Sequence, residues 1–214
     1  MKKKLTGVYK RLYAKFGPQY WWPGETPFEV MVGAVLTQST SWLNVEKAIA
    51  NLKKNKLLNA RKLHNLSHQK RAQLIRSAGY YNIKARRLKE FLSFLIKKHD
   101  VNLKKMSRLD LAKLRQELLK VKGIGQETAD SILLYALNKP IFVVDSYTKR
   151  IFSRHGFISE KAVYEEVQKL FMDNLKHEVK LFNEYHALIV KLAKDFCVKS
   201  KPKCDLCPLE GVHA

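Results

Sequence analysis

The sequence predicts an all-α protein with two helical domains, and three observations support this fold class. Apolar residues recur at helical spacing along almost the whole chain. A pattern typical of a strand is limited to the few residues around Phe142. The 214 residues, 46% of them hydrophobic, can bury a sizeable core, and no apolar run approaches the ~18 residues of a membrane span. We therefore expect a soluble helical protein.

The first half of the chain is predicted to consist of helices separated by short turns. Pro23, Gly24 and Pro27 mark an early loop, and the apolar segment 28–36 after them predicts a buried helix. Further helices are separated by turns near Ser67, Gly79 and Met106. We find no internal repeat or low-complexity tract, which argues against a solenoid of repeated helices.

The segment 118–150 carries the most chemical information. Its turn, 122–126, has the sequence KGIGQ and lies between two apolar segments, and its two glycines permit φ > 0 and close approach to another backbone. The second helix is marked by a stripe at i, i+3, i+4 and i+7, formed by Ala129, Ile132, Leu133 and Ala136. Amides at the start of that helix lack intrahelical partners and can donate to a phosphate. The pattern predicts a helix-hairpin-helix.

A single carboxylate follows this hairpin. Asp145 comes directly after the apolar run 141–144 and, with Ser146, is a favoured N-cap residue for the next helix. A carboxylate at a helix N-terminus is held ionised by the helix dipole and free amides, which suits an electrostatic or general-base role. The alternative is that Asp145 merely caps its helix.

The charge of the chain points to a polyanionic partner. Lys and Arg number 41 against 19 Asp and Glu, a formal charge of +22, which attracts phosphate polyanions and makes binding salt-dependent. Ribosomal and membrane-surface proteins can be equally basic. The basic N-terminus 1–4 has no apolar core behind it and predicts no secretory signal, so we expect a cytoplasmic, prokaryotic, nucleoid-associated setting.

The hairpin, followed about twenty residues later by VVDSYTKR, resembles the helix-hairpin-helix, Gly/Pro-rich, Asp superfamily of DNA glycosylases, which includes endonuclease III. The resemblance implies that Asp145 is catalytic. It also implies a six-helix barrel over residues 24–136 and a second domain from residues 1–23 and 137–214, with a DNA cleft between them. The implied DNA contacts are Gln38, Lys122, Gly123, Gly125, Gln126, Glu127 and Thr128.

Glu127 departs from the endonuclease III branch of this superfamily. That branch carries a lysine two positions after the second glycine, which attacks the sugar as an amine, and this chain has Glu127 there. The missing amine predicts a monofunctional glycosylase that uses water as the nucleophile.

Aromatic residues near the N-terminus bear on the base that is removed. The segments WWPG, GAVLTQ and GYYN-x-KA and the KGIG-x-E hairpin resemble the 3-methyladenine DNA glycosylase III branch. That resemblance implies a pocket in which an alkylated, electron-poor purine stacks on Trp21, Trp22 and Trp42, because a flipped base is received well by aromatic walls. The alternative is that Trp21 and Trp22 are core or domain-interface residues.

Three further polar features bear on the site, and the first of them carries an alternative. Gln38 resembles the family glutamine that fills the gap left by the flipped nucleotide, or it could cap its helix or satisfy a buried amide. Lys84, Arg86 and Arg87 are expected to form a solvated basic face that partly contacts phosphate. His186 resembles a family position near the C-terminal cysteines.

The only cysteines of the chain form a C-terminal motif, Cys197-x6-Cys204-x2-Cys207. Clustered thiols in a cytosolic protein suit a metal better than a disulfide. Endonuclease III and its relatives have a fourth cysteine after five intervening residues and bind a [4Fe-4S] cluster, and this chain has His213 at that place. We expect a [4Fe-4S] cluster, with zinc bound by three thiolates and His213, or no stable metal, as alternatives.

The sequence therefore predicts a DNA N-glycosylase of base excision repair that binds damaged double-stranded DNA as a monomer, flips the base and uses Asp145 to assist water. One alternative is an endonuclease III-type glycosylase and AP lyase acting on oxidised pyrimidines. The other is a non-catalytic DNA-binding protein, which would have no need of Asp145.

Overall fold

The computed structural model describes residues 1–21 and 24–214. Within these residues the chain consists of helices and loops and has no β-strand, which confirms the all-α prediction. It divides into two compact units, one formed by residues 1–21 and 140–214 and the other by residues 22–139. Among the described residues, no helix has both the length and the apolar character that crossing a membrane requires.

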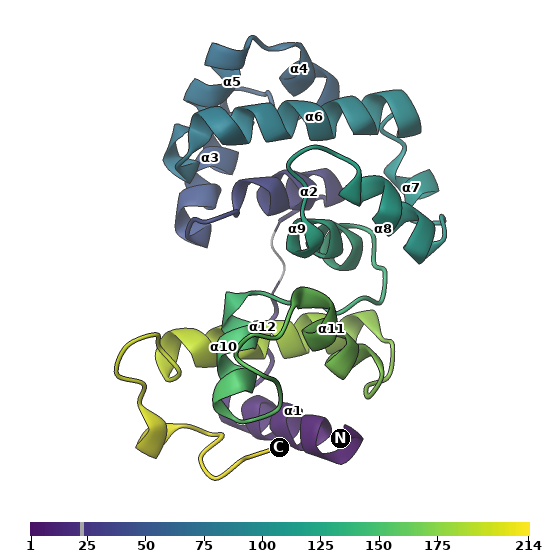
Figure 1. Ribbon diagram of the computed structural model, residues 1–214. Helices are drawn as coiled ribbons and strands as arrows, with labels where there is room; N and C mark the ends of the chain where they lie inside the picture. The colour runs from purple at the N-terminus through teal and green to yellow at the C-terminus, as the bar shows by residue number, and fades with distance from the viewer. Residues whose placement is uncertain (22–23) are drawn as a thin grey trace. The chain divides into compact units, whose positions relative to one another are not determined.

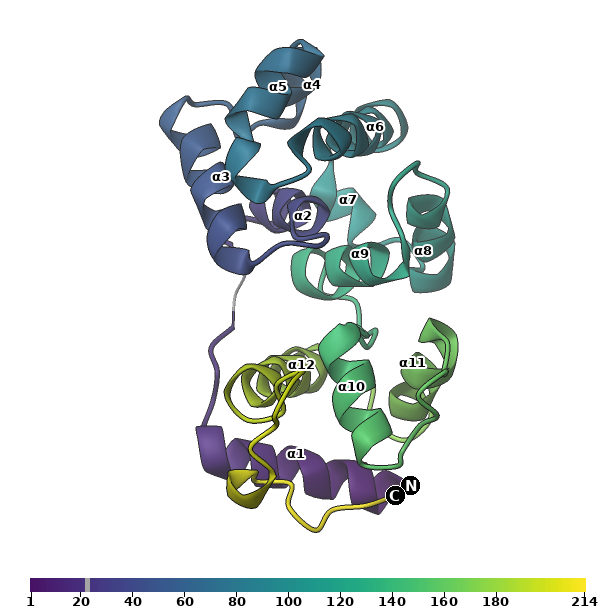
Figure 2. The same cartoon turned by 60° about the vertical axis from the view of Figure 1, so that its left-hand side comes forward.

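Unit 2, residues 22–139, is a layered group of helices around α2 (Figures 1 and 2). Its elements are α2 (Pro27–Leu36), α3 (Trp42–Lys54), α4 (Ala60–Asn65), α5 (His68–Leu74), η1 (Arg76–Ala78), α6 (Tyr81–His99), α7 (Leu103–Met106), α8 (Leu111–Leu119), α9 (Gln126–Ser131) and η2 (Ile132–Ala136). Helix α2 packs against α3, α6, α9 and η2, while α4 and α5 pack on α6.

Helix α2 occupies the centre because almost all of its side chains are apolar. Thr26 accepts a hydrogen bond from the Glu29 amide, and Pro27 occupies the first turn, where its missing N–H costs nothing. Beyond this cap the segment 30–36 is buried on nearly every side. A helix that is apolar all round is stable only inside a core, so α2 organises the unit.

The second helix of the hairpin changes its winding. It begins as α9 and continues through Ile132–Ala136 as a π-helical turn, all of whose residues are buried. The predicted stripe of Ala129, Ile132, Leu133 and Ala136 is buried, and the helix ends before Asn138, whose φ is +52°. A π turn shifts the register of the side chains that follow it.

Unit 1 contains α1 (Lys2–Phe16), α10 (Ser146–Arg154), α11 (Tyr164–Met172), α12 (Val179–Asp195) and η3 (Cys204–Leu206). Its core is aromatic: the ring of Phe142 stacks on Phe171 with centroids 3.8 Å apart, and both meet Tyr185 edge-on. The Tyr185 hydroxyl donates to the Leu5 carbonyl at 2.9 Å, which ties α12 to α1. This core supports the loop 141–144 that leads into α10.

Candidate functional site

The hairpin turn between α8 and α9 uses its two glycines differently. Gly123 has φ +90°, and a Cβ there would collide with the Arg87 side chain, so both conformation and space require glycine. Gly125 is the N-cap of α9 in extended backbone with φ −93°, and a Cβ there would meet nothing within 4 Å. The expectation that both glycines supply φ > 0 was therefore wrong for Gly125. What Gly125 provides is an open backbone.

A buried ion pair locks the two helices of the hairpin together. The Arg115 guanidinium on α8 donates to both carboxylate oxygens of Asp130 on α9, at 2.7 and 3.0 Å. Asp130 is fully buried and Arg115 partly so. A two-point contact of this kind fixes geometry as well as adding energy. The turn between these helices is thus held on a rigid support.

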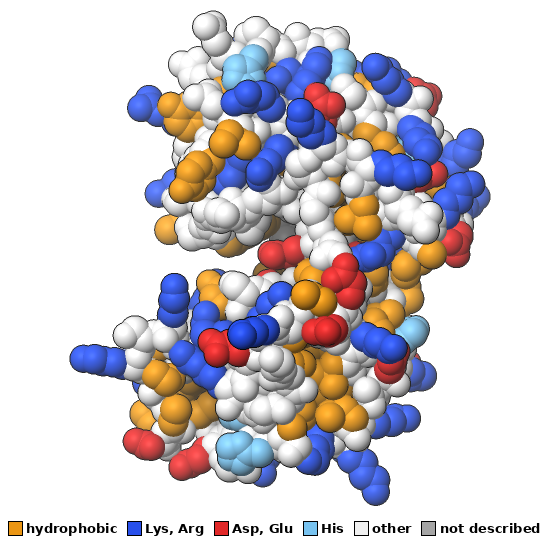
Figure 3. All heavy atoms as spheres, viewed as in Figure 1, with side chains coloured by type: hydrophobic (Ala, Val, Ile, Leu, Met, Phe, Trp, Pro, Cys, Tyr) orange, Lys and Arg blue, Asp and Glu red, His pale blue; other side chains and the backbone are white. Residues whose placement is uncertain are grey.

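The remaining predicted contact residues of the turn lie at its surface, except one. Lys122 and Glu127 are exposed, Gln126 is half-buried, and Thr128 is buried. Lys and Arg side chains are spread over the visible face of each unit (Figure 3). The turn therefore presents backbone and a lysine to solvent in a strongly cationic protein, which suits an anionic backbone as ligand.

Gln38 lies against this turn. Its Nε2 donates to the Gly123 carbonyl and to Thr128 Oγ1, both at 3.0 Å, and its Oε1 accepts from Arg87. In the structure Gln38 is thus bonded to a carbonyl and a hydroxyl of the turn and to Arg87. A role in filling a DNA gap would require Gln38 to exchange these bonds for bonds to bases.

Only part of the basic face predicted on α6 is exposed to solvent. Arg86 is exposed, but Lys84 is buried, and its Nζ donates to the Ala78 carbonyl at 2.6 Å. Burial, with a smaller effect of Arg87, lowers the pKa of Lys84 to about 8. The expectation that Lys84 belongs to a solvated face was therefore wrong. Lys84 instead fastens the turn that precedes α6.

Asp145 is the N-cap of α10, and its two carboxylate oxygens have different partners. Oδ1 accepts from the Thr148 amide at 2.7 Å and from Thr148 Oγ1 at 2.8 Å. Oδ2 lies 3.4 Å from His186 Nε2. Burial alone would raise the pKa of Asp145, but His186 and the Thr148 hydrogen bonds outweigh it and hold the pKa below its ordinary value. Asp145 is thus a cap and, at the same time, an ionised carboxylate.

His186 and Thr148 were not assigned to this site from the sequence. The resemblance implied that His186 packs near the cysteines, yet its ring stacks on Trp21 with centroids 5.4 Å apart and its Nε2 faces Asp145. A signal existed for Thr148, because a side-chain cap contacts the residue three positions on. Nothing local in the sequence points from His186 on α12 to Asp145.

The three tryptophans predicted to line a base pocket are placed differently. Trp21 belongs to unit 1 and stacks on His186, while Trp22 lies outside the described residues. Trp42 opens α3 in unit 2 and lies so close to Gly33 that a Cβ there would be 3.1 Å from the indole.

Trp42 lines a cavity of about 390 Å³ in unit 2. Its other lining residues are Gly24, Glu25, Glu29, Glu46, Ile49, Ala50 and Lys53. Lys53 Nζ bridges two of the acids, at 3.0 Å from Glu25 Oε1 and 2.9 Å from Glu29 Oε2. Three carboxylates and one ammonium leave the lining net negative, which is unusual in a chain of charge +22. An aromatic wall with carboxylates favours a cationic planar ligand over an anionic one.

The cysteine cluster does not form a metal site in the described residues. Cys197 is buried, Cys204 exposed and Cys207 half-buried, and no group of three or more His, Cys, Asp or Glu side chains there could hold an ion. His213 lies beside His155, with ring centroids 6.3 Å apart. Three thiolates and one imidazole are a donor set that a metal can use, but in the described residues the structure does not bring Cys197, Cys204, Cys207 and His213 together as one site.

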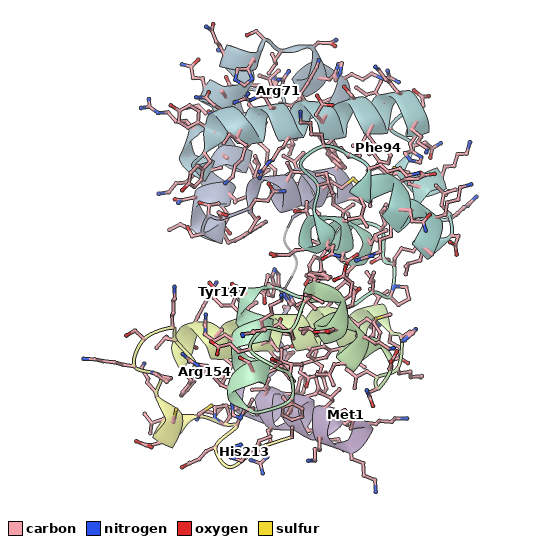
Figure 4. All side chains as sticks on the ribbon, viewed as in Figure 1. Met1, Arg71, Phe94, Tyr147, Arg154 and His213 are labelled. Atoms are coloured by element: carbon pink, nitrogen blue, oxygen red, sulfur yellow. The ribbon has the colours of Figure 1, made fainter. Side chains whose placement is uncertain are left out.

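Arginines of α10 hold the cysteine loop in place. Arg150 donates to the carbonyls of Cys197 and Ala193, and Arg154 donates to Cys197 Sγ at 3.3 Å and to the carbonyls of Val198 and Lys199. Figure 4 shows Arg154 on α10 and His213 near the end of the chain. These bonds satisfy loop carbonyls through protein groups alone.

Comparison with known proteins agrees with this arrangement. Residues 32–177 match the family described as HhH-GPD superfamily base excision DNA repair protein. A protein of Methanocaldococcus jannaschii designated as a candidate DNA repair glycosylase is 51% identical over 205 residues, 95% of this chain and 92% of that protein. Endonuclease III of Sulfolobus acidocaldarius is 35% identical over 62% of this chain and 56% of its own length.

Solved structures show the same fold. The 3-methyladenine DNA glycosylase of H. pylori, bound to 1,N6-ethenoadenine, superposes with a TM-score of 0.77 at 30% identity, covering 89% of this chain and 97% of that one. A trapped covalent complex of endonuclease III with DNA superposes with a TM-score of 0.84 at 24% identity, covering 98% and 93%. At 24% identity, the match to endonuclease III shows the fold alone.

Proposed function

We propose, from the premise that the chain belongs to the HhH-GPD superfamily of base excision DNA repair proteins, that it is a monofunctional DNA glycosylase that excises an alkylated purine from duplex DNA. The DNA glycosylase activity follows from the family. The choice of base and the use of water rather than an amine are our own inferences. The observation that carries the chemistry is the partly buried carboxylate of Asp145, which Thr148 and His186 hold in place and whose pKa they keep below its ordinary value.

The chemical step needs negative charge at the sugar. As the N-glycosidic bond breaks, its electron pair leaves with the base and C1′ becomes oxocarbenium-like. The carboxylate of Asp145, fixed by Thr148, stabilises the positive charge that develops at C1′ and does not need to reorient to do so. Preorganised charge of this kind is commonly the largest catalytic contribution. Water then bonds to C1′ and gives up a proton, for which Asp145 is the base. The products are an abasic site and the free base.

The use of water is supported by the residue at the start of α9. Glu127 is exposed where the lyase branch has its amine, and a carboxylate cannot form a Schiff base. The neighbouring turn would instead hold the DNA backbone through main-chain groups near Gly125, with Lys122 adding charge. Binding through these groups positions the strand and reads no sequence.

A preference for alkylated purines is supported by the cavity at Trp42. A purine methylated at N3 or N7 in DNA is cationic, and stacking on an indole together with nearby carboxylates favours it over a neutral base. The match to the 3-methyladenine DNA glycosylase of H. pylori, at 30% identity, points the same way.

Iron binding at the C-terminal cysteines stays a prediction. A [4Fe-4S] cluster would be held by Cys197, Cys204 and Cys207 and would stiffen the loop, with no part in the chemistry at Asp145. Iron and zinc analysis of protein prepared without oxygen tests it. About four iron atoms per chain would support the cluster, and iron-free protein with normal activity would exclude it.

The proposed function is tested by duplexes that each carry one defined lesion. Free base and strand cleavage are scored separately with 3-methyladenine, 1,N6-ethenoadenine and thymine glycol. The proposal expects release of an alkylated purine with little cleavage. Release of thymine glycol with cleavage would support the endonuclease III-type alternative, and tight binding without any release would support a non-catalytic binder.

A further inference from the structure

The carboxylate of Asp145 has one oxygen that Thr148 does not hold. Both Thr148 hydrogen bonds go to Oδ1, so Oδ2 is the oxygen whose position depends on another group. The group that faces it from α12 is His186, whose Nε2 lies 3.4 Å away. This distance is long for a hydrogen bond but short for an ion pair, and such contacts tighten when a substrate excludes water.

His186 is itself confined. Its side chain is 6% exposed, and the Trp21 ring stacks on it at an interplanar angle of 25°. The residues beside it on α12 belong to the core, where Tyr185 is fully buried and bonded to Leu5. The imidazole is therefore enclosed by Trp21 and the core around α12, with its Nε2 facing Oδ2.

We propose that His186 is the positioning residue of the catalytic carboxylate: its Nε2 fixes the orientation of Oδ2 of Asp145, whose side chain is only 13% exposed. Trp21 covers the imidazole on its other face. This inference rests on the proposed function for its link to catalysis, but the contact itself belongs to unit 1 alone. It also gives Trp21 a role other than stacking on a base.

Opposing effects act on the pKa of the Asp145 carboxyl. Burial penalises the charged form of Asp145, and His186 is the strongest effect that opposes it, ahead of the hydrogen bonds from Thr148. Removing the imidazole would leave burial opposed by Thr148 only. The pKa of Asp145 should then rise, and activity that needs the carboxylate should be lost at a higher pH than in the wild type.

The direct test follows the Asp145 carboxyl by ¹³C NMR through a pH titration. Its resonance is identified as the one that disappears in Asp145→Asn. We compare the wild type with His186→Phe, which keeps a ring against Trp21 but has no nitrogen. Thr148→Val is the matched control, since it removes one hydrogen bond to Oδ1 and keeps the amide. The pH dependence of single-turnover base release is measured on the same proteins.

The expected result is an upward shift of the Asp145 midpoint in His186→Phe that exceeds the shift in Thr148→Val, with the acid limb of the rate profile moving by the same amount. Should His186→Phe not fold, His186→Gln replaces it, and its side-chain amide should give a smaller upward shift. An unchanged midpoint in a folded His186 variant would overturn the proposal. If the wild type releases no base from any lesion, the proposed function fails, while the carboxyl titration still decides whether His186 controls Asp145.

Discussion

The starts of α9 and α10 offer the same backbone feature and use it in opposite ways. Both helices begin with amides that no earlier turn of helix satisfies. At α9 the N-cap is Gly125, which has no side chain, and the space around its backbone is open. At α10 the N-cap is Asp145, whose own carboxylate accepts from the Thr148 amide. The start of α9 thus has no side-chain cap, whereas the start of α10 is capped by a carboxylate of the chain itself.

The uncapped start of α9 and the capped start of α10 would allow one fold to bind DNA at one helix and to carry out chemistry at another. A helix start without a side-chain cap can donate to any phosphate, so it supplies affinity without selecting a base. A start that is capped by its own carboxylate keeps that carboxylate charged and in place. Hence changes at α9 should alter DNA affinity, and changes at α10 should alter the rate of the chemical step.

The largest expected effect comes from placing an amine at the start of α9. Glu127→Lys should convert a protein that borohydride does not trap on abasic DNA into one that is trapped, because a lysine there can form a Schiff base. The trapped complex is counted on a denaturing gel, with Glu160→Lys, at an exposed site in unit 1, as the control. Efficient trapping of the wild type would contradict the monofunctional assignment.

The next effect concerns stability and separates the two glycines of the hairpin. Gly123→Ala should destabilise the protein by about 1–3 kcal/mol, since alanine is strained at φ +90° and its Cβ displaces Arg87 from Gln38. Gly125→Ala should have the same free energy of unfolding as the wild type, because residue 125 has an extended backbone that alanine can adopt and its Cβ would meet nothing within 4 Å. Denaturant melts of both variants provide the measurement. Equal stability of the two would show that the turn adapts.

Trp42→Ala tests whether the excised base stacks on Trp42. Losing a stacked indole costs about 1–3 kcal/mol per base, and a cationic base loses a further ~0.5–2 kcal/mol. Single-turnover excision of 3-methyladenine should therefore fall more than tenfold, since 1.36 kcal/mol is one decade. Leu43→Ala, on the exposed side of α3, is the control. Equal losses with all lesions, accompanied by a lower melting temperature, would assign Trp42 to the core instead.

The smallest effect is expected at the cavity rim. Glu46 is exposed, so Glu46→Gln should lower the preference for a cationic over a neutral base by only a few-fold, and less at high salt. Glu90→Gln, an exposed change on α6, is the matched control. The ratio of the two excision rates is the quantity to compare. A ratio that rises in Glu46→Gln would contradict an acidic base pocket.

Local features of this molecule could be predicted from its sequence. The hairpin, the helix after it and the cap at Asp145 were all anticipated, because glycines, apolar spacing and N-cap residues act within a few positions of the chain. The central position of α2 followed from its apolar segment for the same reason.

Features that depend on distant contacts could not be predicted. Lys84 was expected to be solvated because its neighbours in the sequence are basic, but the turn at Ala78 folds back onto its ammonium. Gln38 is bonded to a turn 85 residues away, and His186 reaches Asp145 from another helix. Periodicity carries no information on such pairs. The assignment of His213 as a fourth metal ligand stays a prediction, and the structure places its ring 6.3 Å from that of His155.

The central claim, that α9 binds and α10 reacts, is tested most directly by measuring two quantities in two variants. The dissociation constant for lesion-bearing duplex and the single-turnover rate at saturating protein are determined for Gly125→Ala and Asp145→Asn. Asparagine can still cap α10 but carries no charge. The account predicts weaker binding with a nearly normal rate in Gly125→Ala, and near-normal binding in Asp145→Asn with a rate lower by at least about 10²–10³-fold. An Asp145→Asn protein that releases base at the wild-type rate would reduce Asp145 to a helix cap and contradict the account.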